Sequence, residues 1–314
     1  MTSLMNPVVS ICIPAYRQIQ FLKKTLESIQ AQEFTDYELV ISDDSPDDSV
    51  QKLLKEFNFL GKLIYSKNAS PLGSPANWNK AVDLCTGDLI KMMHHDDWFS
   101  GPDSLGGFVD LIGNDPKVGF AFSGVNTKSP NSDTYLHQYV STKEVRALKS
   151  NRMPLMLGNC IGPPSSTIIR REHFKRYREN LQWLVDVFQY AEILDETEFA
   201  FTPKALIYST TGAEHQITNS CQNNPGLLIY EYLYFFEHIK KLGQINCHPY
   251  INYLKELILK YGIEQESAIR RYGYEGNIPP EILEVLQLSS SRKQLKLLEL
   301  KIRRKANAVL RAIG

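Results

Sequence analysis

Three absences limit what kind of protein this chain can be. Its 314 residues include only five cysteines, scattered and never in a Cys-x-x-Cys spacing, so neither a disulfide framework nor a cysteine zinc site is expected. No uncharged apolar stretch approaches the roughly 20 residues of a membrane-spanning helix, and the first ten residues lack the basic flank and apolar run of a signal peptide. A formal net charge of zero argues against a general affinity for nucleic acid. We therefore expect a cytoplasmic protein, either soluble or peripheral to a membrane.

The charge is unevenly distributed along the chain. The segment from Ser291 to Gly314 holds eight Lys/Arg and one Glu, a net charge of +7, which leaves −7 on the rest. Its apolar residues recur every three or four positions, as in an amphipathic helix: Leu295, Leu298, Ile302, Ala306, Val309 and Ile313. Two interpretations stay open. The helix contacts an anionic membrane surface, or it packs on the body of the protein or pairs with a second subunit in a homodimer.

The first hundred residues alternate between strand patterns and helix patterns. Apolar, β-branched runs predict strands, with the first one stopped by Pro14: Val8 to Ile13, Tyr37 to Ser42, Lys62 to Tyr65, and Asp88 to Met93. Apolar residues at helical spacing lie between them, and the helix before the fourth strand is expected to end near Gly87. This βαβ rhythm predicts an α/β fold with a mostly parallel sheet flanked by helices.

Polar side chains gather where the predicted strands end. Pro14, Ala15 and Tyr16 follow the first strand, Asp43 and Asp44 follow the second, and the run His94-His95-Asp96-Asp97 follows the fourth. In open α/β sheets, ligands bind at the carboxyl ends of the strands. No glycine-rich phosphate loop follows the first strand, so a divalent cation on Asp96 or Asp97 is the natural means of holding phosphates. The other interpretation is that these acids simply form a turn or cap a helix.

The stretches VSICIPAYR and LVISDDS and the run from Gly87 to Asp97 together resemble the nucleotide-binding half of glycosyltransferase family 2, which has the GT-A fold. The resemblance covers roughly residues 7 to 220. It implies a nucleotide-sugar-binding and catalytic domain over residues 1–220. Residues 221–314 are then a helical C-terminal extension that carries the basic amphipathic tail.

The resemblance also assigns site residues. It places the nucleotide base against Pro14, Tyr16 and Asp44. Ala15 and Asp43 at the same strand ends, and Asn77 further along the chain, are also expected to bind the nucleotide sugar. Asp96 is expected near the ribose and Asp97 on the metal. Many family members have Asp-x-Asp-Asp where this chain has His94-His95-Asp96-Asp97, so one carboxylate is replaced by imidazole. Carboxylate and phosphate oxygens suit Mn²⁺ or Mg²⁺, and a ligating imidazole favours Mn²⁺ or a later transition metal.

A general base is expected in the stretch ENLQWLVDVFQYAEIL, read as a helix that Asn180 caps. Asp186 is an acid surrounded by apolar neighbours there, and WLVDVFQY matches a common form of the family's base-bearing helix, so we assign the base to Asp186. The alternative is a structural carboxylate paired with Arg170, Arg171 or a backbone donor. The acids at or beyond the helix end are weaker candidates: Glu192, Asp195, Glu196 and Glu198.

Two further segments are expected to shape the site. Residues 160–170 resemble the family's approach to the acceptor pocket, although an ordinary loop is the alternative. The stretch TTGAEHQIT places His215 in a polar loop after the strand Ala205 to Tyr208, where the family often has a loop that closes over the diphosphate. A surface histidine is the equally simple alternative.

These observations predict an inverting, metal-dependent glycosyltransferase. The donor is a nucleotide diphosphate sugar, with UDP-sugars favoured, and the acceptor is a hydroxyl of a glycan or lipid-linked saccharide in bacterial surface polysaccharide synthesis. The alternative is a catalytically silent nucleotide-sugar or glycan-binding module of the same fold. Peripheral attachment at the inner face of the cytoplasmic membrane would follow from the basic tail.

Overall fold

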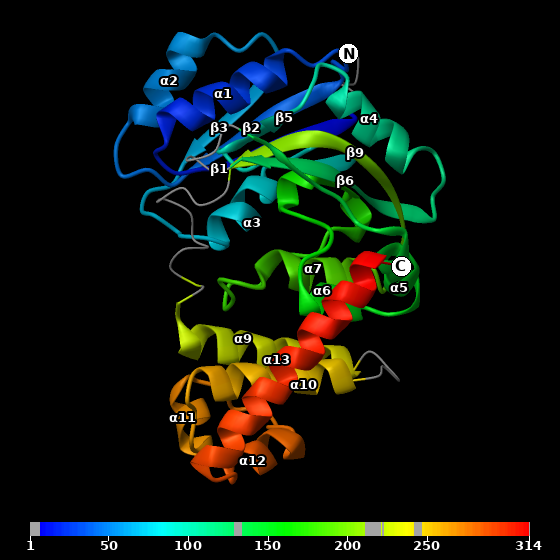
Figure 1. The fold of residues 1–314 in the computed structure, drawn as a ribbon. Coiled ribbons are helices and arrows are strands. Elements are labelled where there is room, and N and C mark those ends of the chain that lie inside the picture. The colour runs from blue at the N-terminus through cyan, green and yellow to red at the C-terminus, as the bar shows by residue number, and fades with distance from the viewer. Residues whose placement is uncertain (1–6, 129–133, 211–220, 222, 242–246, 314) are drawn as a thin grey trace. The chain divides into compact units, whose positions relative to one another are not determined.

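The computed structural model describes residues 7–128, 134–210, 221, 223–241 and 247–313 (Figure 1). These residues pack into two compact units. The first unit comprises the chain up to residue 140 together with residues 160–181 and 185–216. The second comprises residues 141–159, 182–184 and the chain from 217 onward.

Within the described residues, the first unit is built on a nine-stranded sheet with the order β3-β2-β1-β4-β8-β6-β9-β5, and β7 pairs with β6. The bounds of the strands are β1 Val9–Ala15, β2 Tyr37–Asp43, β3 Lys62–Lys67, β4 Leu89–Met92, β5 Asp97–Phe99, β6 Val118–Lys128, β7 Leu136–Gln138, β8 Thr167–Arg170 and β9 Glu198–Thr210. The four strands β3, β2, β1 and β4 are mutually parallel, as the βαβ pattern predicts. β8 then runs antiparallel to both β4 and β6.

The first strand is longer than the sequence predicts, because it continues through Pro14 to Ala15. Pro14 pairs with Ser42 of β2. Successive residues of a strand direct their backbone groups to opposite neighbours, and the N–H that proline lacks would point toward β4. That strand has already ended at Met92, so the proline removes no ladder hydrogen bond at this position.

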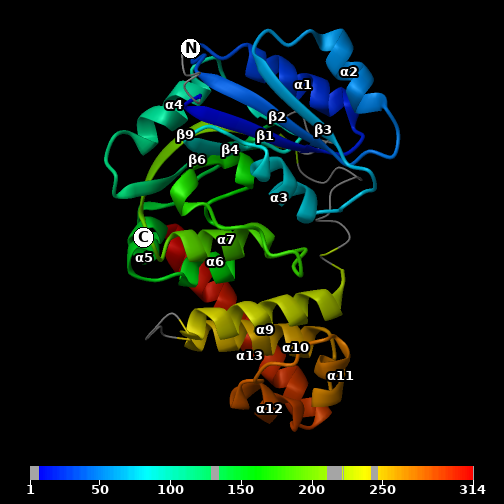
Figure 2. The ribbon, with the colours of Figure 1, turned by 180° about the vertical axis from the view of Figure 1, so that it is seen from behind.

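Helices cover both faces of this sheet. Their bounds are α1 Ile19–Gln30, α2 Ser49–Phe57, α3 Ala76–Asp83, α4 Ser104–Ile112 and α7 Val185–Ile193, with single 3-10 turns η1 Pro164–Ser166 and η2 Arg171–His173. The two views agree that α1, α2 and α4 lie on one face and α3 on the other (Figures 1 and 2). On the side of α7, the ring of Tyr190 packs 5.5 Å from Phe120 of β6.

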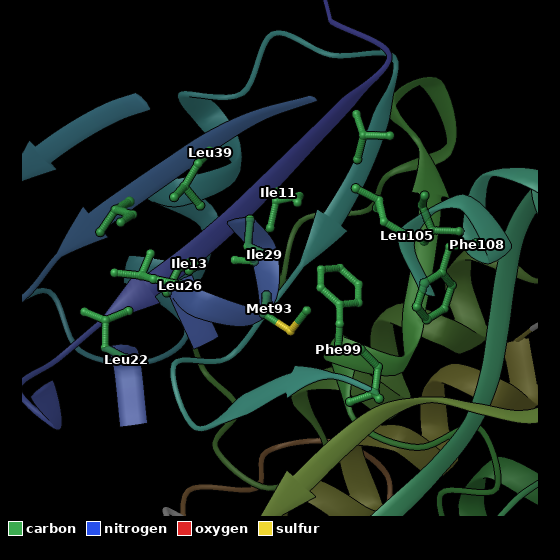
Figure 3. Packing of buried hydrophobic residues seen from close by; sticks show 14 of the residues in the cluster. Ile11, Ile13, Leu22, Leu26, Ile29, Leu39, Met93, Phe99, Leu105 and Phe108 are labelled. Carbon is green, nitrogen blue, oxygen red and sulfur yellow. The ribbon is translucent and has the colours of Figure 1, made fainter. Parts of the chain in front are cut away.

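The hydrophobic core of the first unit lies between the sheet and the helices α1, α2 and α4 (Figure 3). The apolar residues that predicted α1 face inward, and Phe99 and Phe108 extend the same core toward α4. Fully burying each such side chain contributes about 1.5–3 kcal/mol. This packing fixes the strand ends on which the polar residues stand.

The helix before the fourth strand ends earlier than predicted, since α3 stops at Asp83 and not near Gly87. Gly87 instead packs directly against β1. A Cβ atom at this position would lie 2.8 Å from the backbone nitrogen of Ser10 and from the carbonyl carbon of Val9. Only glycine lets the chain pass this close to β1 before it enters β4.

The second unit is helical in its described residues. Its helices are α5 Thr142–Ser150, α6 Met153–Leu157, α9 Pro225–Lys241, α10 His248–Lys260, α11 Glu266–Arg271, α12 Pro280–Leu286 and α13 Ser290–Ile313. Leu300 of α13 is buried, and Arg304 forms an ion pair of 3.1 Å with Glu256 of α10. None of the helices described here combines the length and apolar character needed to cross a bilayer.

A buried carboxylate of α9 holds the segment that leads into α7. The oxygens of Glu231 accept hydrogen bonds from the backbone N–H groups of Gln182 (2.6 Å), Trp183 (2.9 Å) and Leu184 (2.7 Å). These three residues directly precede α7, which begins at Val185, so the prediction that Asn180 caps this helix is wrong. The carboxylate satisfies buried amide groups that lie before the first turn of the helix.

Candidate active site

The carboxylate of Asp44 fastens a loop over the end of β2. Its Oδ1 accepts hydrogen bonds from the side chain of Asn68 and the backbone of Leu72, both at 2.8 Å, and its Oδ2 accepts one from the backbone of Gly73 at 2.7 Å. The backbone N–H of Asp44 in turn donates to the carbonyl of Ala15 at 2.9 Å, which joins β2 to the end of β1. Asp44 is therefore held rigidly, and Oδ2 keeps a lone pair for a further donor.

Asn77, at the start of α3, connects the same strand ends. Its Oδ1 accepts from Ser42 at 2.7 Å and from Asn68 at 3.0 Å, while its Nδ2 donates to the carbonyl of Ser42 at 3.1 Å. Asn77 is only 4% exposed, so this network is sheltered from water. The sequence singled out Asn77 but missed Asn68, which lies just after β3 and contacts both Asp44 and Asn77.

The neighbouring predicted residues differ in how much they are exposed. Asp43 is buried and accepts from the hydroxyl of Tyr65 at 2.8 Å and from the backbone of Ser45 at 2.9 Å. Tyr16, just beyond β1, is 44% exposed, and the guanidinium of Arg17 lies 5.4 Å from the centre of its ring. Tyr16 therefore offers an open aromatic face beside the anchored acids.

The backbone immediately after Tyr16 is strained. Arg17 and Gln18 both adopt left-handed conformations, with φ of 53° and 50°. Such conformations cost about 1–3 kcal/mol each for residues other than glycine and persist only where surrounding structure enforces them. The N–H of Arg17 donates to the hydroxyl of Ser45 at 2.8 Å, which fixes this turn against the residues after β2.

The run His94 to Asp97 forms a cluster of potential metal ligands. One ligand atom each from His94, Asp96 and Asp97 lies within 4.8 Å of the others. The run turns back on itself, since the N–H of Asp97 donates to the carbonyl of His94 at 3.1 Å, and Asp97 then begins β5. The turn thus brings together residues that a continuing strand would separate.

Residues from distant segments hold this turn in place. The hydroxyl of Thr25 in α1 lies 2.9 Å from the carbonyl oxygen of His95 and 2.7 Å from that of Asp97. The hydroxyl of Ser165 accepts from the N–H of His94 at 2.9 Å. The segment 160–170, predicted to approach the acceptor pocket, therefore contacts the ligand cluster through Ser165.

The electrostatics of the cluster favour a bound cation. Burial raises the pKa of Asp97, and the nearby negative charge of Asp96 raises it further, while hydrogen bonds from Ser165 and Ser209 oppose the shift. Burial lowers the pKa of His94 to about 4, so its imidazole is neutral near pH 7. Its Nε2 atom is buried and has no hydrogen-bond partner among the described residues. A neutral imidazole beside two crowded carboxylates fits a divalent cation, for which all three would serve as ligands.

A buried lysine that the sequence analysis missed lies behind the cluster. Lys91 of β4 is fully buried, and its ammonium group donates to the carbonyl of Ser165 and lies 4.6 Å from the centre of the Phe108 ring. Burial lowers the pKa of Lys91 to about 7, and the charge of Asp97 opposes that shift. A charged residue inside the apolar strand LIKM was the signal available in the sequence.

Two packed aromatic rings adjoin the cluster, and the charge of Asp186 acts on the second of them. The ring of Trp78 lies 4.6 Å from His94 and meets Tyr177 edge-on at 5.0 Å. Tyr177 is buried, and its pKa is raised first by burial and then by the charges of Cys12 and Asp186. Asp186 is itself half-buried in α7 and accepts from the backbone N–H of Val187 at 2.8 Å.

The arginines proposed as structural partners of Asp186 have other contacts. The guanidinium of Arg170 donates to the carbonyls of Val118 (2.9 Å) and Gly113 (2.7 Å), and that of Arg171 donates to the carbonyl of Gly87 at 2.7 Å. Of the weaker acidic candidates, Glu192 forms an ion pair of 2.5 Å with Arg178 and Glu196 one of 2.5 Å with Lys175. His215 lies outside the described residues.

Solved structures share this fold over most of the chain. The structure of Staphylococcus aureus TarS residues 1–349 in complex with UDP-GlcNAc aligns with a TM-score of 0.58 and 17% identity over 94% of this chain and 79% of that one. The mannosyltransferase PcManGT from Pyrobaculum calidifontis, in complex with GDP-Man and Mn²⁺, aligns with a TM-score of 0.57 and 14% identity over 96% and 87%. The fold is that of the GT-A glycosyltransferases.

The sequence model of glycosyl transferase family 2 matches residues 10–178, more than half of the chain. The chain belongs to this family, and the predicted resemblance and fold class are confirmed. It is 26% identical to an uncharacterized protein of Mycobacterium tuberculosis over 64% of this chain and 66% of that one. It is 32% identical to the abequosyltransferase RfbV of Salmonella typhimurium over 29% of this chain and 28% of that one. The matched regions thus span under two thirds of these relatives' own length.

Proposed function

We propose that the protein is an inverting, metal-dependent glycosyltransferase. It transfers a sugar from a nucleotide diphosphate sugar, a UDP-sugar, to a hydroxyl of a glycan or lipid-linked saccharide. The observation that carries the proposal is the cluster of potential metal ligands, His94, Asp96 and Asp97, at the end of β4 in a family 2 chain with the GT-A fold. Asp186, half-buried at the start of α7, is the proposed base.

In this proposal the nucleotide binds at the ends of β1 and β2. The exposed ring of Tyr16 packs against the base, beside Pro14 and Ala15. Asp44 accepts a hydrogen bond from the base through the lone pair left on Oδ2, and Asp43 and Asn77 keep it in position. His215 remains a predicted donor to the diphosphate. UDP-GlcNAc is the ligand in the TarS structure, which is consistent with a UDP-sugar donor here.

The reaction is a single displacement at the anomeric carbon. Asp186 accepts the proton of the acceptor hydroxyl as its oxygen attacks, and the bond to the nucleotide diphosphate breaks on the opposite side, which inverts the configuration. Asp97 would hold Mn²⁺ or Mg²⁺, with Asp96 and His94 beside it, and the bound cation supplies counter-charge to the departing diphosphate. The Mn²⁺ in the PcManGT structure is consistent with such a site.

Release of free nucleoside diphosphate tests the proposal. A thermal-shift panel of nucleotide sugars, with and without Mn²⁺, identifies the preferred donor because a bound ligand raises apparent stability by mass action. That donor is then incubated with saccharide acceptors while UDP release is recorded. Acceptor-dependent release supports the enzyme, whereas metal-dependent donor binding without release over a broad acceptor panel supports the silent binding module.

The second unit supports a peripheral membrane location on the cytoplasmic face. Three apolar residues of α13 project into solvent, with exposed fractions of 67% for Leu295, 57% for Leu298 and 58% for Ile302. They lie on one side of the helix, away from the buried Leu300. Arg292 and Lys301 lie on either side of this stripe, which suits an anionic bilayer that carries a lipid-linked acceptor, whereas Arg304 is paired with Glu256. A homodimer through the same stripe is the competing interpretation.

A role in bacterial surface polysaccharide synthesis completes the proposal. It is consistent with two relatives, the abequosyltransferase of Salmonella typhimurium and a Campylobacter jejuni glucosyltransferase that is 30% identical over 29% of this chain and is named for an undecaprenol-linked saccharide. The proposed catalytic domain is residues 1–220, and residues 221–314 form the proposed extension that brings it to the acceptor.

A further inference from the structure

A row of aromatic side chains crosses one face of the sheet beside the ligand cluster. Trp98 of β5 pairs with Tyr208 of β9, and their ring centroids are 6.1 Å apart. Tyr135, one residue before β7, packs on Tyr208 at 4.7 Å and is 43% exposed. Paired residues of neighbouring strands project to the same face, so the three rings lie next to one another. Trp98 is only 9% exposed, so the half-buried Tyr208 and the exposed Tyr135 are the rings that solvent reaches.

Two lysines flank these rings. The ammonium group of Lys24, on α1, lies 3.4 Å from the centre of the Trp98 ring, and that of Lys128, at the end of β6, lies 5.5 Å from the centre of the Tyr135 ring. The pKa of Lys24 is lowered by partial burial and then by the positive charge of Lys128, while Glu27 opposes the shift. Both ammonium groups thus lie over rings of the same row, so an anionic ligand on that row would meet a positive charge at each end.

The surface adjoins the ligand cluster. The hydroxyl of Thr210 donates to Oδ2 of Asp96 at 3.2 Å, and Thr210 pairs with Lys128 across β9 and β6. The ammonium group of Lys128 in turn lies over the ring of Tyr135. A molecule that rests on Tyr208 and Tyr135 thus lies beside the place where the proposed donor diphosphate is held.

We propose that Tyr208, Tyr135, Lys24 and Lys128, with Trp98 packed under Lys24, form an aromatic–lysine surface that binds an anionic saccharide, and that this saccharide is the acceptor. The C–H face of a sugar ring is apolar and packs against the negative face of an aromatic ring. The two ammonium groups supply partners for a phosphate or carboxylate on the sugar. The binding surface stands by itself, and its role as the acceptor site rests on the proposed function.

Three tetrasaccharides of equal length test the surface: neutral maltotetraose, 6-phosphomaltotetraose and tetragalacturonate. Binding to the full chain is measured by calorimetry, without donor. We expect both charged probes to bind about tenfold more tightly than maltotetraose, equivalent to about 1.4 kcal/mol. The charged probe that binds more tightly shows whether the surface prefers a phosphate or a carboxylate on the sugar.

Variants locate the binding on this surface. Lys24→Met and Lys128→Met keep the aliphatic stem and should each lower the affinity for the charged probes by about fivefold or more while leaving maltotetraose unaffected. Tyr135→Ala should weaken all three probes. The matched controls are Lys23→Met, an exposed neighbour of Lys24, and Leu136→Ala, whose exposed side chain lies on the other face of β7.

Equal affinity for neutral and charged probes, or charged-probe binding unchanged in both lysine variants, would overturn the proposal. Nucleotide binding is measured in parallel as the thermal shift that UDP produces. This shift should be the same in all variants. If the charged probes bind as expected but UDP is never released in the presence of any acceptor, the proposed transferase fails and the aromatic–lysine surface stands.

Discussion

The ring of Trp78 lies 4.6 Å from the imidazole of His94, tilted by 46°. This contact limits the rotation of the imidazole, and the N–H of His94 is fixed independently by Ser165. A ligand whose ring is already oriented loses little entropy when it binds a metal, so the packing of α3 contributes to the affinity of the cluster.

The first prediction concerns metal preference. His94→Asp restores a carboxylate in place of the imidazole, and oxygen ligands favour Mg²⁺ relative to the later transition metals. We expect the ratio of Mn²⁺ to Mg²⁺ affinity to fall by about tenfold, measured as the metal dependence of donor binding. His248→Asp, at the exposed start of α10, serves as control. An unchanged ratio would mean that His94 does not ligate the metal.

Asp97→Ala should abolish metal-stimulated donor binding. The diphosphate then lacks its counter-ion, because the central ligand of the cluster is gone. Titration of Mn²⁺ at fixed donor concentration checks this, with Asp110→Ala on the exposed side of α4 as the control. If the mutant and the parent show the same Mn²⁺ dependence, the metal is bound elsewhere.

Asp186→Asn keeps the shape of the side chain but removes its ability to accept a proton. We expect the transfer rate to fall by about 10² to 10⁴ while donor affinity changes little, because a general base acts mainly in the transition state. Asp195→Asn, an acid just beyond the same helix, should retain activity. Near-normal turnover of Asp186→Asn would refute the assignment, and global unfolding would favour a structural carboxylate.

A pH-dependent contribution to stability is expected from Glu38 of β2. Burial by itself would raise the pKa of Glu38, but the ion pair with Lys62 at 2.6 Å and hydrogen bonds from Ser10 and Thr86 outweigh it and hold the pKa at about 2. The unfolded value is about 4.3, so the stabilisation is complete above that pH and is lost as pH falls toward 2.

Glu38→Gln should therefore lower the free energy of unfolding by about 2–3 kcal/mol at pH 7 and by about half as much at pH 3. Urea unfolding at the two pH values measures the difference, and Glu56→Gln, on the exposed side of α2, should cost little at either. A loss of equal size at both pH values would show that packing, and not ionisation, is responsible.

Deleting residues 291–314 should separate membrane binding from catalysis. Each suitably placed Lys or Arg contributes about 1 kcal/mol of attraction to an anionic bilayer. The truncated protein should lose sedimentation with anionic liposomes yet keep activity on a soluble acceptor, and salt should weaken binding of the full chain. If the full chain does not bind such liposomes, or if truncation converts a dimer to a monomer in light scattering, α13 forms a subunit interface and does not bind membranes.

The parallel half of the fold was predictable because its strands are short, mainly apolar runs that alternate with segments of helical spacing. Asp43 and the ligand cluster stand where the ends of these strands meet. Helix α7 shows the limit of this approach. The apolar spacing continues through Leu181 and Leu184, both buried, although the helix itself begins only at Val185. The spacing of apolar residues indicates which side chains are buried. Here it predicts a helix that starts earlier than the observed one.

The residues that the sequence analysis missed act across long distances along the chain. Ser165 is 71 residues from His94, and Thr25 is 72 residues from Asp97. A serine and a threonine have no local feature that marks them as partners of an acidic turn, since their role follows only once β8 and α1 are placed on the sheet. Lys91 differs, because a charge within an apolar strand is visible in the sequence.

The dependence of the ligand turn on Thr25 and Ser165 has a consequence for protein engineering. Copying His94 to Asp97 onto another parallel sheet would transfer the donor atoms without the hydroxyl groups that hold the backbone carbonyls and amides around them. The smallest portable unit joins the strand β4 and its turn to one face of α1 and to the 3-10 turn before β8. A designer seeking this centre in a new scaffold would have to import three separate pieces of chain.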